Sequence, residues 1–184
     1  MKNAIIIHGM PDKEDYFNPK ADSQSNCHWL PWLQQQLNIN GILSQTPEMP
    51  EPYNPNYEKW KMVFEQFKID ENTVLVGHSC GAGFIVRYLS ENSIKVGKVV
   101  LVAPWINSQR EEPVTMFDNL KIDENLLNKT NGLTIFSSSD DNQAIKNSIN
   151  VLKNSLKDVK VLEFKNYGHF CFGDMKTREF QELL

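Results

Sequence analysis

The sequence is poor in cysteine, and this scarcity excludes several classes of protein. Its 184 residues contain three cysteines: Cys27, Cys80 and Cys171. Three cysteines cannot all pair within one chain, so we expect no disulfide scaffold, and a reducing cytoplasm is the compartment that fits this usage. Their spacing matches no zinc-binding motif, and we predict a protein that uses no metal and no cofactor.

Long apolar runs and clusters of positive charge are absent too. No run approaches the roughly 20 apolar residues of a membrane span, and the apolar run in MKNAIIIHG is too short for a signal peptide. We therefore expect no association with a membrane. The net charge is −4 and no lysine or arginine cluster occurs, which disfavours nucleic acid as a partner.

What the sequence does contain is an alternation of strand-like and helix-like segments. Six short runs rich in Val, Ile and Leu are typical of strands buried on both faces. They cover residues 3–7, 42–45, 73–76, 98–102, 133–137 and 159–164. Between them, apolar residues recur at helical spacing in stretches that begin near Leu30, Tyr57, Ile85 and Ile145. A last short helix is expected near Asp174, which could cap it.

This alternation predicts an α/β fold, in which a parallel sheet with right-handed crossovers carries helices on both faces. The length fits a single domain over residues 1–184. Residues 104–130 separate two strands by more than one helix needs. Long insertions often serve as lids or binding loops, but a surface segment with its own packing residues explains the length equally well.

The stretch TVLVGHSCGAGFIVRYL, residues 73–89, carries the strongest functional signal. Gly77, Ser79 and Gly81 fit G-x-S-x-G, the nucleophile elbow, in which a serine stands in a tight turn between a strand and a helix. The motif alone is weak, but here an apolar strand ends at it and an amphipathic helix follows. We therefore predict Ser79 as a nucleophile rather than part of a glycine-rich packing turn.

A serine hydroxyl needs a base, and the base needs an orienting acid. In this arrangement the order along the chain is Ser, then Asp or Glu, then His. His169 is the only histidine after the motif, and it follows the sixth strand directly. Asp140 and Asp141 follow the fifth strand. Either could be the acid, since the residues themselves do not choose between them.

Several stretches together resemble the α/β-hydrolases and, more narrowly, the RBBP9/YdeN family of small serine hydrolases. They are IIIHG, HWLPWLQQQL, PEMPEPYNPNYEKW, TVLVGHSCGA, VLVAPW, SSSDDNQAI and NYGHF. The resemblance implies a compact α/β-hydrolase fold with six parallel strands in the order 2-1-3-4-5-6. Such a sheet has a switch point beside its first strand, where a crevice opens.

The resemblance also implies roles for individual residues. It places the oxyanion hole at the backbone amides of Met10 and Cys80, and it favours Asp141 over Asp140 as the acid. It leaves His78 as a packing residue or a contact behind the site. The chain departs from the family pattern after the acid, where it has Asn142-Gln143-Ala144 in place of a proline and a larger aliphatic residue.

We therefore expect a serine hydrolase of the carboxylesterase type (EC 3.1.1) with the triad Ser79, Asp141 and His169. Its substrate would be a small molecule, an ester, thioester or amide of a small carboxylic acid. The alternative is an interaction protein that keeps the fold without turnover, because fold does not imply function. Trp105, Phe117, Tyr167 and Phe170 could line an apolar pocket or belong to the core. A monomer and a weak dimer both remain open.

Overall fold

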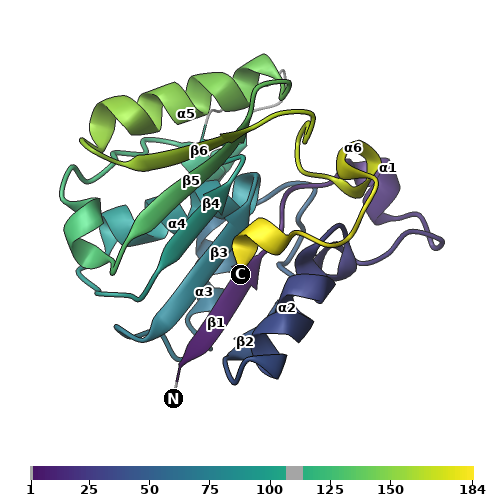
Figure 1. The fold of residues 1–184 in the computed structure, drawn as a ribbon, viewed down its shortest axis with the longest axis horizontal. Helices are drawn as coiled ribbons and strands as arrows, with labels where there is room; N and C mark the ends of the chain where they lie inside the picture. Colours follow the sequence, from purple (N-terminus) through teal and green to yellow (C-terminus); the bar gives the residue numbers. More distant parts are fainter. Residues whose placement is uncertain (1, 107–113) are drawn as a thin grey trace.

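The computed structural model describes residues 2–106 and 114–184 of the chain. Within these residues six strands form one sheet in the order β2-β1-β3-β4-β5-β6, and every neighbouring pair is parallel (Figure 1). The predicted α/β-hydrolase fold and strand order are thereby confirmed. The strands are β1 (Asn3–Ile7), β2 (Leu43–Gln45), β3 (Thr73–His78), β4 (Val99–Val102), β5 (Leu133–Ser138) and β6 (Lys160–Phe164).

The helices follow the predicted pattern in the long segments and add short ones that the pattern did not reveal. The long helices are α2 (Leu30–Ile39), α3 (Tyr57–Phe64), α4 (Cys80–Glu91) and α5 (Gln143–Ser155). The short ones are α1 (Lys13–Tyr16), α6 (Phe172–Met175) and the 3-10 turns η1 (Gln24–Asn26), η2 (Thr115–Phe117), η3 (Leu126–Lys129) and η4 (Gln181–Leu183). The described residues include no helix long and apolar enough to cross a membrane.

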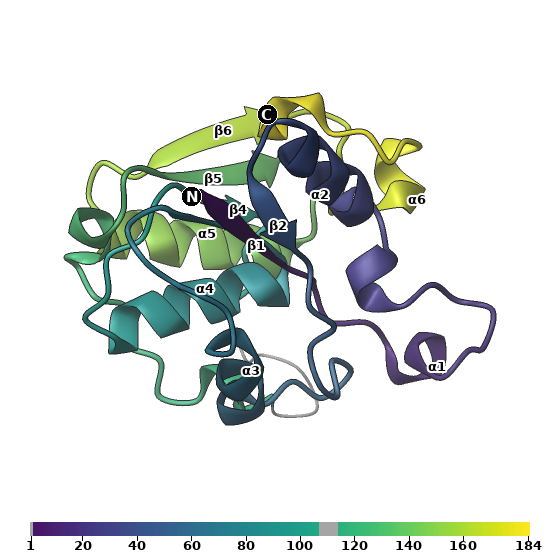
Figure 2. The ribbon, with the colours of Figure 1, turned by 90° about the horizontal axis from the view of Figure 1, so that it is seen from below.

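One face of the sheet is covered by α3, α4 and α5 (Figure 2). Strand side chains alternate between faces, and those on this face are almost completely removed from water. Leu75, Leu101 and Ile135 are 0 % exposed, and Ile5 is 1 % exposed. This is the principal hydrophobic core, and it fixes the central strands whose carboxyl ends carry the site.

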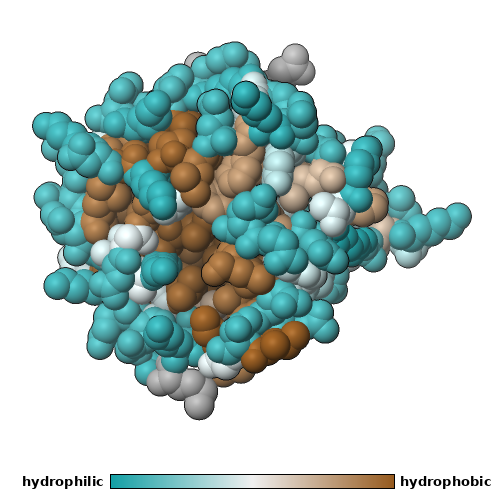
Figure 3. All heavy atoms as spheres, in the orientation of Figure 1, coloured by the Kyte–Doolittle hydropathy of each residue, from teal (hydrophilic) through white to brown (hydrophobic). Residues whose placement is uncertain are grey.

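The opposite face is covered less evenly. The helix α2 lies over it beside β1 and β2, and the C-terminal segment crosses its middle (Figures 1 and 2). Hydrophobic side chains gather on this face over the strands (Figure 3). Val74 and Val100 are half-buried, and Leu162 of the edge strand β6 is 38 % exposed. The covered part includes Phe170 and Phe180, both 0 % exposed, which anchor the C-terminal loops to the sheet.

The predicted cap of the last helix is wrong. The helix α6 begins at Phe172 after an N-cap at Cys171, so Asp174 lies inside it. A carboxylate oxygen of Asp174 accepts a hydrogen bond from the backbone N–H of His169 at 2.9 Å. Asp174 therefore holds the loop before the helix instead of capping the helix.

The long segment between β4 and β5 is described only in part. Residues 104–130, for which a lid and a packed surface segment were both open, include 107–113, which lie outside the described residues. In the described remainder, the rings of Trp105 and Phe117 meet edge to face at 5.3 Å. Met116 and Leu126 are 0 % exposed. The described part of this segment therefore contributes side chains to the core.

Candidate active site

Ser79 stands at the junction of β3 and α4 in an uncommon backbone conformation. Its φ is 52° and its ψ is −117°, a combination that costs a residue with a side chain about 1–3 kcal/mol. Three backbone hydrogen bonds hold it there. The N–H of Ser79 donates to the Val102 carbonyl at 2.9 Å, and the Ser79 carbonyl accepts from Gly83 and Trp105, each at 3.1 Å. The turn is thus fixed by its neighbours on β4 and α4.

The glycines on either side of the serine make this turn sterically possible. A Cβ at Gly77 would lie 2.6 Å from the backbone of Ala82, and one at Gly81 would lie 2.4 Å from the carbonyl oxygens of Ile7 and His8. Neither contact can be relieved by a rotating side chain. Glycine at position 77 therefore allows β3 and α4 to approach each other this closely, and glycine at position 81 allows α4 to approach the end of β1.

His169 lies in the loop after β6 and reaches Ser79 across the ends of the strands. Its Nε2 is 2.9 Å from Oγ of Ser79. Its Nδ1 is 3.0 Å and 3.1 Å from the two carboxylate oxygens of Asp141. Since an ionised carboxylate only accepts, Nδ1 carries the proton and Nε2 is free to accept from the serine hydroxyl. The structure brings Ser79, His169 and Asp141 into one chain of hydrogen bonds.

The two neighbouring aspartates have different surroundings. The side chain of Asp141 is 1 % exposed, and its carboxylate also accepts from the N–H of Asn142 at 2.7 Å. The Asp140 carboxylate instead accepts from the Ser138 hydroxyl and from the N–H of Gly168 at 3.2 Å. The Ser138 hydrogen bond, as the largest cause, lowers the pKa of Asp140. Asp141 thus meets the ring of His169, and Asp140 ties down the loop that carries it.

The residues after Asp141 fit the loop despite their departure from the family pattern. Asn142 is the N-cap of α5, and its side-chain oxygen accepts from the N–H of Ile145 at 3.1 Å. Asparagine is among the best N-cap residues. The helix therefore starts directly behind Asp141 without a proline.

His78 lies behind the site and is 2 % exposed. Its Nε2 is 2.8 Å from the carbonyl oxygen of His169, which can only accept, so Nε2 carries a proton. Burial, as the largest cause, lowers the pKa of His78 well below its ordinary value. His78 is therefore a neutral donor that holds the backbone of the histidine loop.

His8 likewise fixes a segment of backbone near Ser79. Its Nδ1 lies 2.7 Å from the Gly9 carbonyl, and its Nε2 accepts from the N–H of Met49 at 2.9 Å. Burial is the largest cause of its lowered pKa, so this ring is neutral too. The Gly9 carbonyl and the Met10 N–H belong to one peptide plane. A hydrogen bond that fixes the carbonyl therefore also fixes the direction of the Met10 amide.

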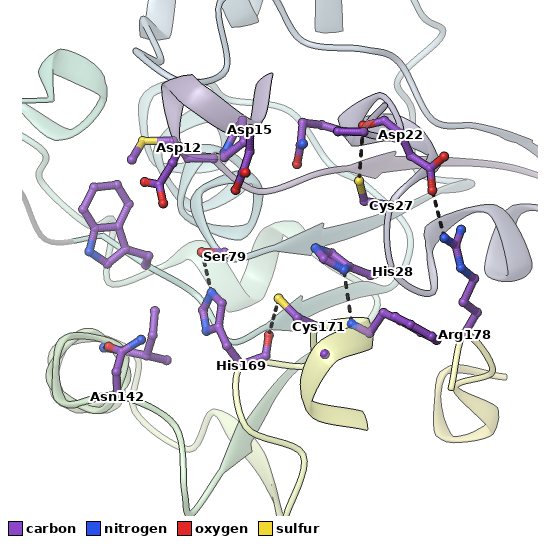
Figure 4. A pocket seen from close by; sticks show the side chains of 18 of the residues that line it. Asp12, Asp15, Asp22, Cys27, His28, Ser79, Asn142, His169, Cys171 and Arg178 are labelled. Carbon is purple, nitrogen blue, oxygen red and sulfur yellow. Dashed lines mark hydrogen bonds and ion pairs between the residues drawn. The ribbon is translucent and has the colours of Figure 1, made fainter. Parts of the chain in front are cut away.

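A cavity of about 750 Å³ opens over Ser79 and His169 (Figure 4). One wall comes from the loop after β1 and includes Met10, Asp12, Asp15, Cys27 and His28. The opposite side is built from Trp105, the start of α5 and the loop from His169 to Gly173. Within the described residues, no group of three or more His, Cys, Asp or Glu side chains is arranged to hold a metal ion.

The four aromatic residues Trp105, Phe117, Tyr167 and Phe170 do not together line an apolar pocket. Of these four, only Trp105 lines the cavity. Phe170 is 0 % exposed and stacks on Phe180 with ring centroids 5.5 Å apart, and Tyr167 packs against Phe164 at 4.9 Å. Phe117 is buried against Trp105. Phe117 and Phe170 therefore belong to the core, and Tyr167 is half-buried and packed against it.

The sequence patterns did not identify the wall formed by residues 10–28. This wall is held by contacts between the two ends of the chain. The N–H of Phe172 donates to Nδ1 of His28 at 3.2 Å, and Arg178 donates to the Asn26 carbonyl at 3.2 Å and to Asp22 at 2.8 Å. The HWLPWL stretch carries part of the family resemblance, and this was the sequence signal that pointed to a role for the end of this segment in the site.

Comparison with known proteins gives a consistent result. A family model described as "Serine hydrolase" matches residues 19–174. The chain is 28 % identical over 179 residues to YdeN of Bacillus subtilis (strain 168), which is named as a hydrolase, covering 92 % of this chain and 86 % of YdeN. It is 25 % identical over 161 residues to the serine hydrolase RBBP9 of Rattus norvegicus, covering 85 % and 82 % of the two chains.

Solved structures show the same fold. The crystal structure of the ydeN gene product from B. subtilis superposes with a TM-score of 0.78 at 25 % identity, over 100 % of this chain and 95 % of that one. Est1E from Butyrivibrio proteoclasticus superposes with a TM-score of 0.63 at 15 % identity, over 92 % and 80 % of the chains. The second likeness concerns the fold alone.

Proposed function

The chain belongs to the family of small serine hydrolases that includes YdeN and RBBP9, and from this premise we propose that it cleaves an ester, thioester or amide of a small carboxylic acid through an acyl-enzyme. The observation that carries the proposal is the continuous chain of hydrogen bonds from Ser79 through His169 to the buried carboxylate of Asp141. The residues of this hydrogen-bond chain border a cavity large enough for a small substrate (Figure 4).

In the first step, Oγ of Ser79 attacks the carbonyl carbon of the substrate while Nε2 of His169 takes the hydroxyl proton. The Asp141 carboxylate keeps the proton on Nδ1 and stabilises the imidazolium that forms. Collapse of the tetrahedral intermediate breaks the bond to the leaving group, which receives the proton from Nε2. The acyl group is then bound to Ser79 as an ester.

In the second step, His169 takes a proton from water, and the hydroxide oxygen attacks the acyl carbon. The bond to Oγ of Ser79 breaks, the serine recovers its proton from Nε2, and the carboxylic acid leaves. Only the substrate and one water molecule are consumed, and all three side chains return to their starting state.

We assign the oxyanion hole to the backbone amides of Met10 and Cys80. Cys80 is the first residue of α4, and the N-terminus of a helix favours negative charge. Met10 lines the cavity beside Ser79, and His8 fixes the peptide plane that carries its N–H. Two preorganised donors would stabilise the developing charge, and removing one such donor typically costs about 10²–10³ in rate.

Labelling with a fluorophosphonate probe tests the proposal directly. We expect the probe to react at one residue, with the adduct found by mass spectrometry on the peptide that contains Ser79. Pre-incubation with the probe should abolish hydrolysis of activated short-chain esters. A folded protein that neither reacts with the probe nor hydrolyses any ester, thioester or aminoacyl amide would favour the alternative, an interaction protein on a hydrolase fold.

A further inference from the structure

His28 has a backbone conformation that calls for an explanation. Its φ is 57°, in the left-handed region that glycine and asparagine adopt more readily than histidine. The residue opens the HWLPWL stretch and comes directly before Trp29, the N-cap of α2. Strained positions of this kind are often associated with function, and this one places an imidazole against the cavity.

The hydrogen bonds of the ring determine which nitrogen carries its proton. Nδ1 of His28 accepts from the backbone N–H of Phe172 at 3.2 Å. Burial, followed by the nearby His169, lowers the pKa of His28 to about 4, so the ring is neutral at pH 7. A neutral imidazole that accepts at Nδ1 donates at Nε2. Of the described residues, none meets Nε2 with a hydrogen bond.

The ring also lies close to the reacting groups. Its centroid is 5.6 Å from that of His78, and the centroid of His78 is 5.1 Å from that of His169. In Figure 4 His28 lies to the right of Ser79 and above the loop that carries Cys171, and a dashed line joins its ring to that loop. The cavity is lined by Arg178 as well as by Asp12 and Asp15, and Arg178 and Asp174 act on the ring with opposite charges, so neither sign of charge is favoured in its partner.

We propose that His28 is a specificity-determining residue that donates a hydrogen bond from Nε2 to an uncharged oxygen of the substrate, close to the bond that is cleaved. This inference rests on the proposed hydrolase function. The substrate class that it names is an ester, thioester or amide with a second oxygen acceptor, such as an ether, hydroxyl or carbonyl oxygen, in its acyl or leaving group. A purely aliphatic substrate would leave the donor unpaired.

Two matched pairs of esters test the proposal. In the first pair, p-nitrophenyl methoxyacetate and p-nitrophenyl butyrate differ by oxygen against methylene in the acyl group. In the second pair, 2-methoxyethyl and butyl esters of one acid differ in the same way in the leaving group. The ratio of kcat/KM within a pair is compared between the wild type and a variant, which cancels the intrinsic reactivity of the esters.

The variants are chosen to preserve the backbone. His28→Gly accepts φ of 57° without strain and removes the donor, whereas His28→Asn accepts this φ and keeps an N–H donor. We expect His28→Gly to lower the oxygen-to-methylene ratio about tenfold in at least one pair, the usual value of one hydrogen bond. His28→Asn should lower it less. Gln35→Ala, which changes an exposed polar residue of α2 outside the cavity, should leave both ratios unchanged.

Unchanged ratios in both pairs for His28→Gly would overturn the proposal while leaving the hydrolase intact. A second measurement does not depend on turnover. In ¹⁵N-labelled protein, the ring nitrogens of His28 should show a protonated Nε2 and an unprotonated Nδ1 between pH 6 and 8. The opposite tautomer would also overturn the proposal. Failure of the hydrolase function itself would show separately, as absence of fluorophosphonate labelling at Ser79.

Discussion

The two parts of the proposed active site, the reacting centre and the wall formed by residues 10–28, are built in different ways. The centre consists of Ser79, His169 and Asp141, which lie at the carboxyl ends of β3, β6 and β5 and are joined by hydrogen bonds of 2.9–3.1 Å. The wall is held to the rest of the molecule by surface contacts. The ion pair of Arg178 and Asp22, for example, has side chains that are 49 % and 54 % exposed.

This difference in construction suggests that the two parts have different roles in the reaction. Groups held by the sheet keep the geometry that the chemical step requires, and small displacements there cost rate. Groups on an exposed wall contribute mainly contacts with the substrate. We therefore expect changes at the centre to lower kcat for every substrate. Changes of side chains at the wall, which leave the Met10 amide in place, should alter KM for some substrates only.

The largest effect is expected at the nucleophile. Ser79→Ala removes the hydroxyl that accepts the acyl group in the proposed mechanism, and it should lower kcat by roughly 10⁴-fold or more. The measurement is hydrolysis of an activated ester, with thermal melting followed by circular dichroism to show that the fold persists. Wild-type turnover in the folded variant would mean that the nucleophile is another residue.

The next effect separates the two aspartates. Asp141→Asn replaces the buried carboxylate beside Nδ1 of His169 and should lower kcat by up to about 10⁴-fold, because the neutral amide no longer stabilises the imidazolium. Asp140→Asn is the matched control. Its side-chain oxygen can still accept from Ser138 and Gly168, so the rate should stay within a few fold of the wild type. A greater loss in Asp140→Asn than in Asp141→Asn would reverse the assignment.

A smaller effect is expected from His78, which supports the centre from behind. His78→Leu removes the nitrogen donor to the His169 carbonyl and leaves that oxygen with the weak thiol donor of Cys171 at 3.7 Å, a cost of about 1 kcal/mol or more. We expect kcat to fall about 10–100-fold with little change in KM. His78→Gln can supply an N–H at a similar position and should recover part of the rate. Equal losses in both variants would point to packing rather than to the hydrogen bond.

The histidines also predict how stability depends on pH. The pKa values of His28 and His78 are lower in the folded protein than their ordinary value of 6.5. Below about pH 6.5 the unfolded chain therefore binds more protons than the folded one, so the free energy of unfolding decreases as the pH falls. For His28 this loss continues down to its folded pKa of about 4.

The contribution of the wall to this dependence can be measured with His28→Asn. Urea unfolding at pH 7 and pH 5 should show a smaller loss of stability in the variant than in the wild type. The difference is bounded by about 1.4 kcal/mol per pH unit for one proton. An identical loss of the free energy of unfolding between pH 7 and pH 5 in the two proteins would show that folding does not lower the pKa of His28.

The smallest effect is expected for the exposed carboxylates of the wall. Asp12→Asn removes a charge from an exposed residue at the N-cap of α1, where its side chain makes no capping hydrogen bond. For a neutral ester, kcat should stay within about twofold of the wild type, since surface changes away from the reacting groups are usually minor. A tenfold loss of kcat would show that the wall belongs to the reacting centre after all.

Much of the fold and of the centre could be predicted from the sequence, because both depend on local patterns. Each predicted strand agrees with the structure to within two residues, since strands buried in a parallel sheet form continuous apolar runs. Ser79, His169 and the aspartate pair were identified by their places after strands. The choice of Asp141 needed the family resemblance, because adjacent side chains of one type carry no distinguishing pattern.

The wall could not be predicted in the same way. The helix α1 has four residues, too few for a periodic pattern, and none of them is buried. The contact between His28 and Phe172 joins residues 144 positions apart, and no local signal reports it. The error at Asp174 has a similar origin, since its true partner is a backbone N–H that only the folded loop presents.

The conformation of Ser79 has a consequence for how this chain can evolve. Glycine would fit φ of 52° with less strain than serine, yet glycine has no hydroxyl. At this position, a mutation that increases the stability of the fold would therefore remove the activity. Substitutions elsewhere that stabilise β3 or α4 offset the strain at Ser79. The stability of the rest of the fold therefore allows the chain to keep a strained but reactive serine.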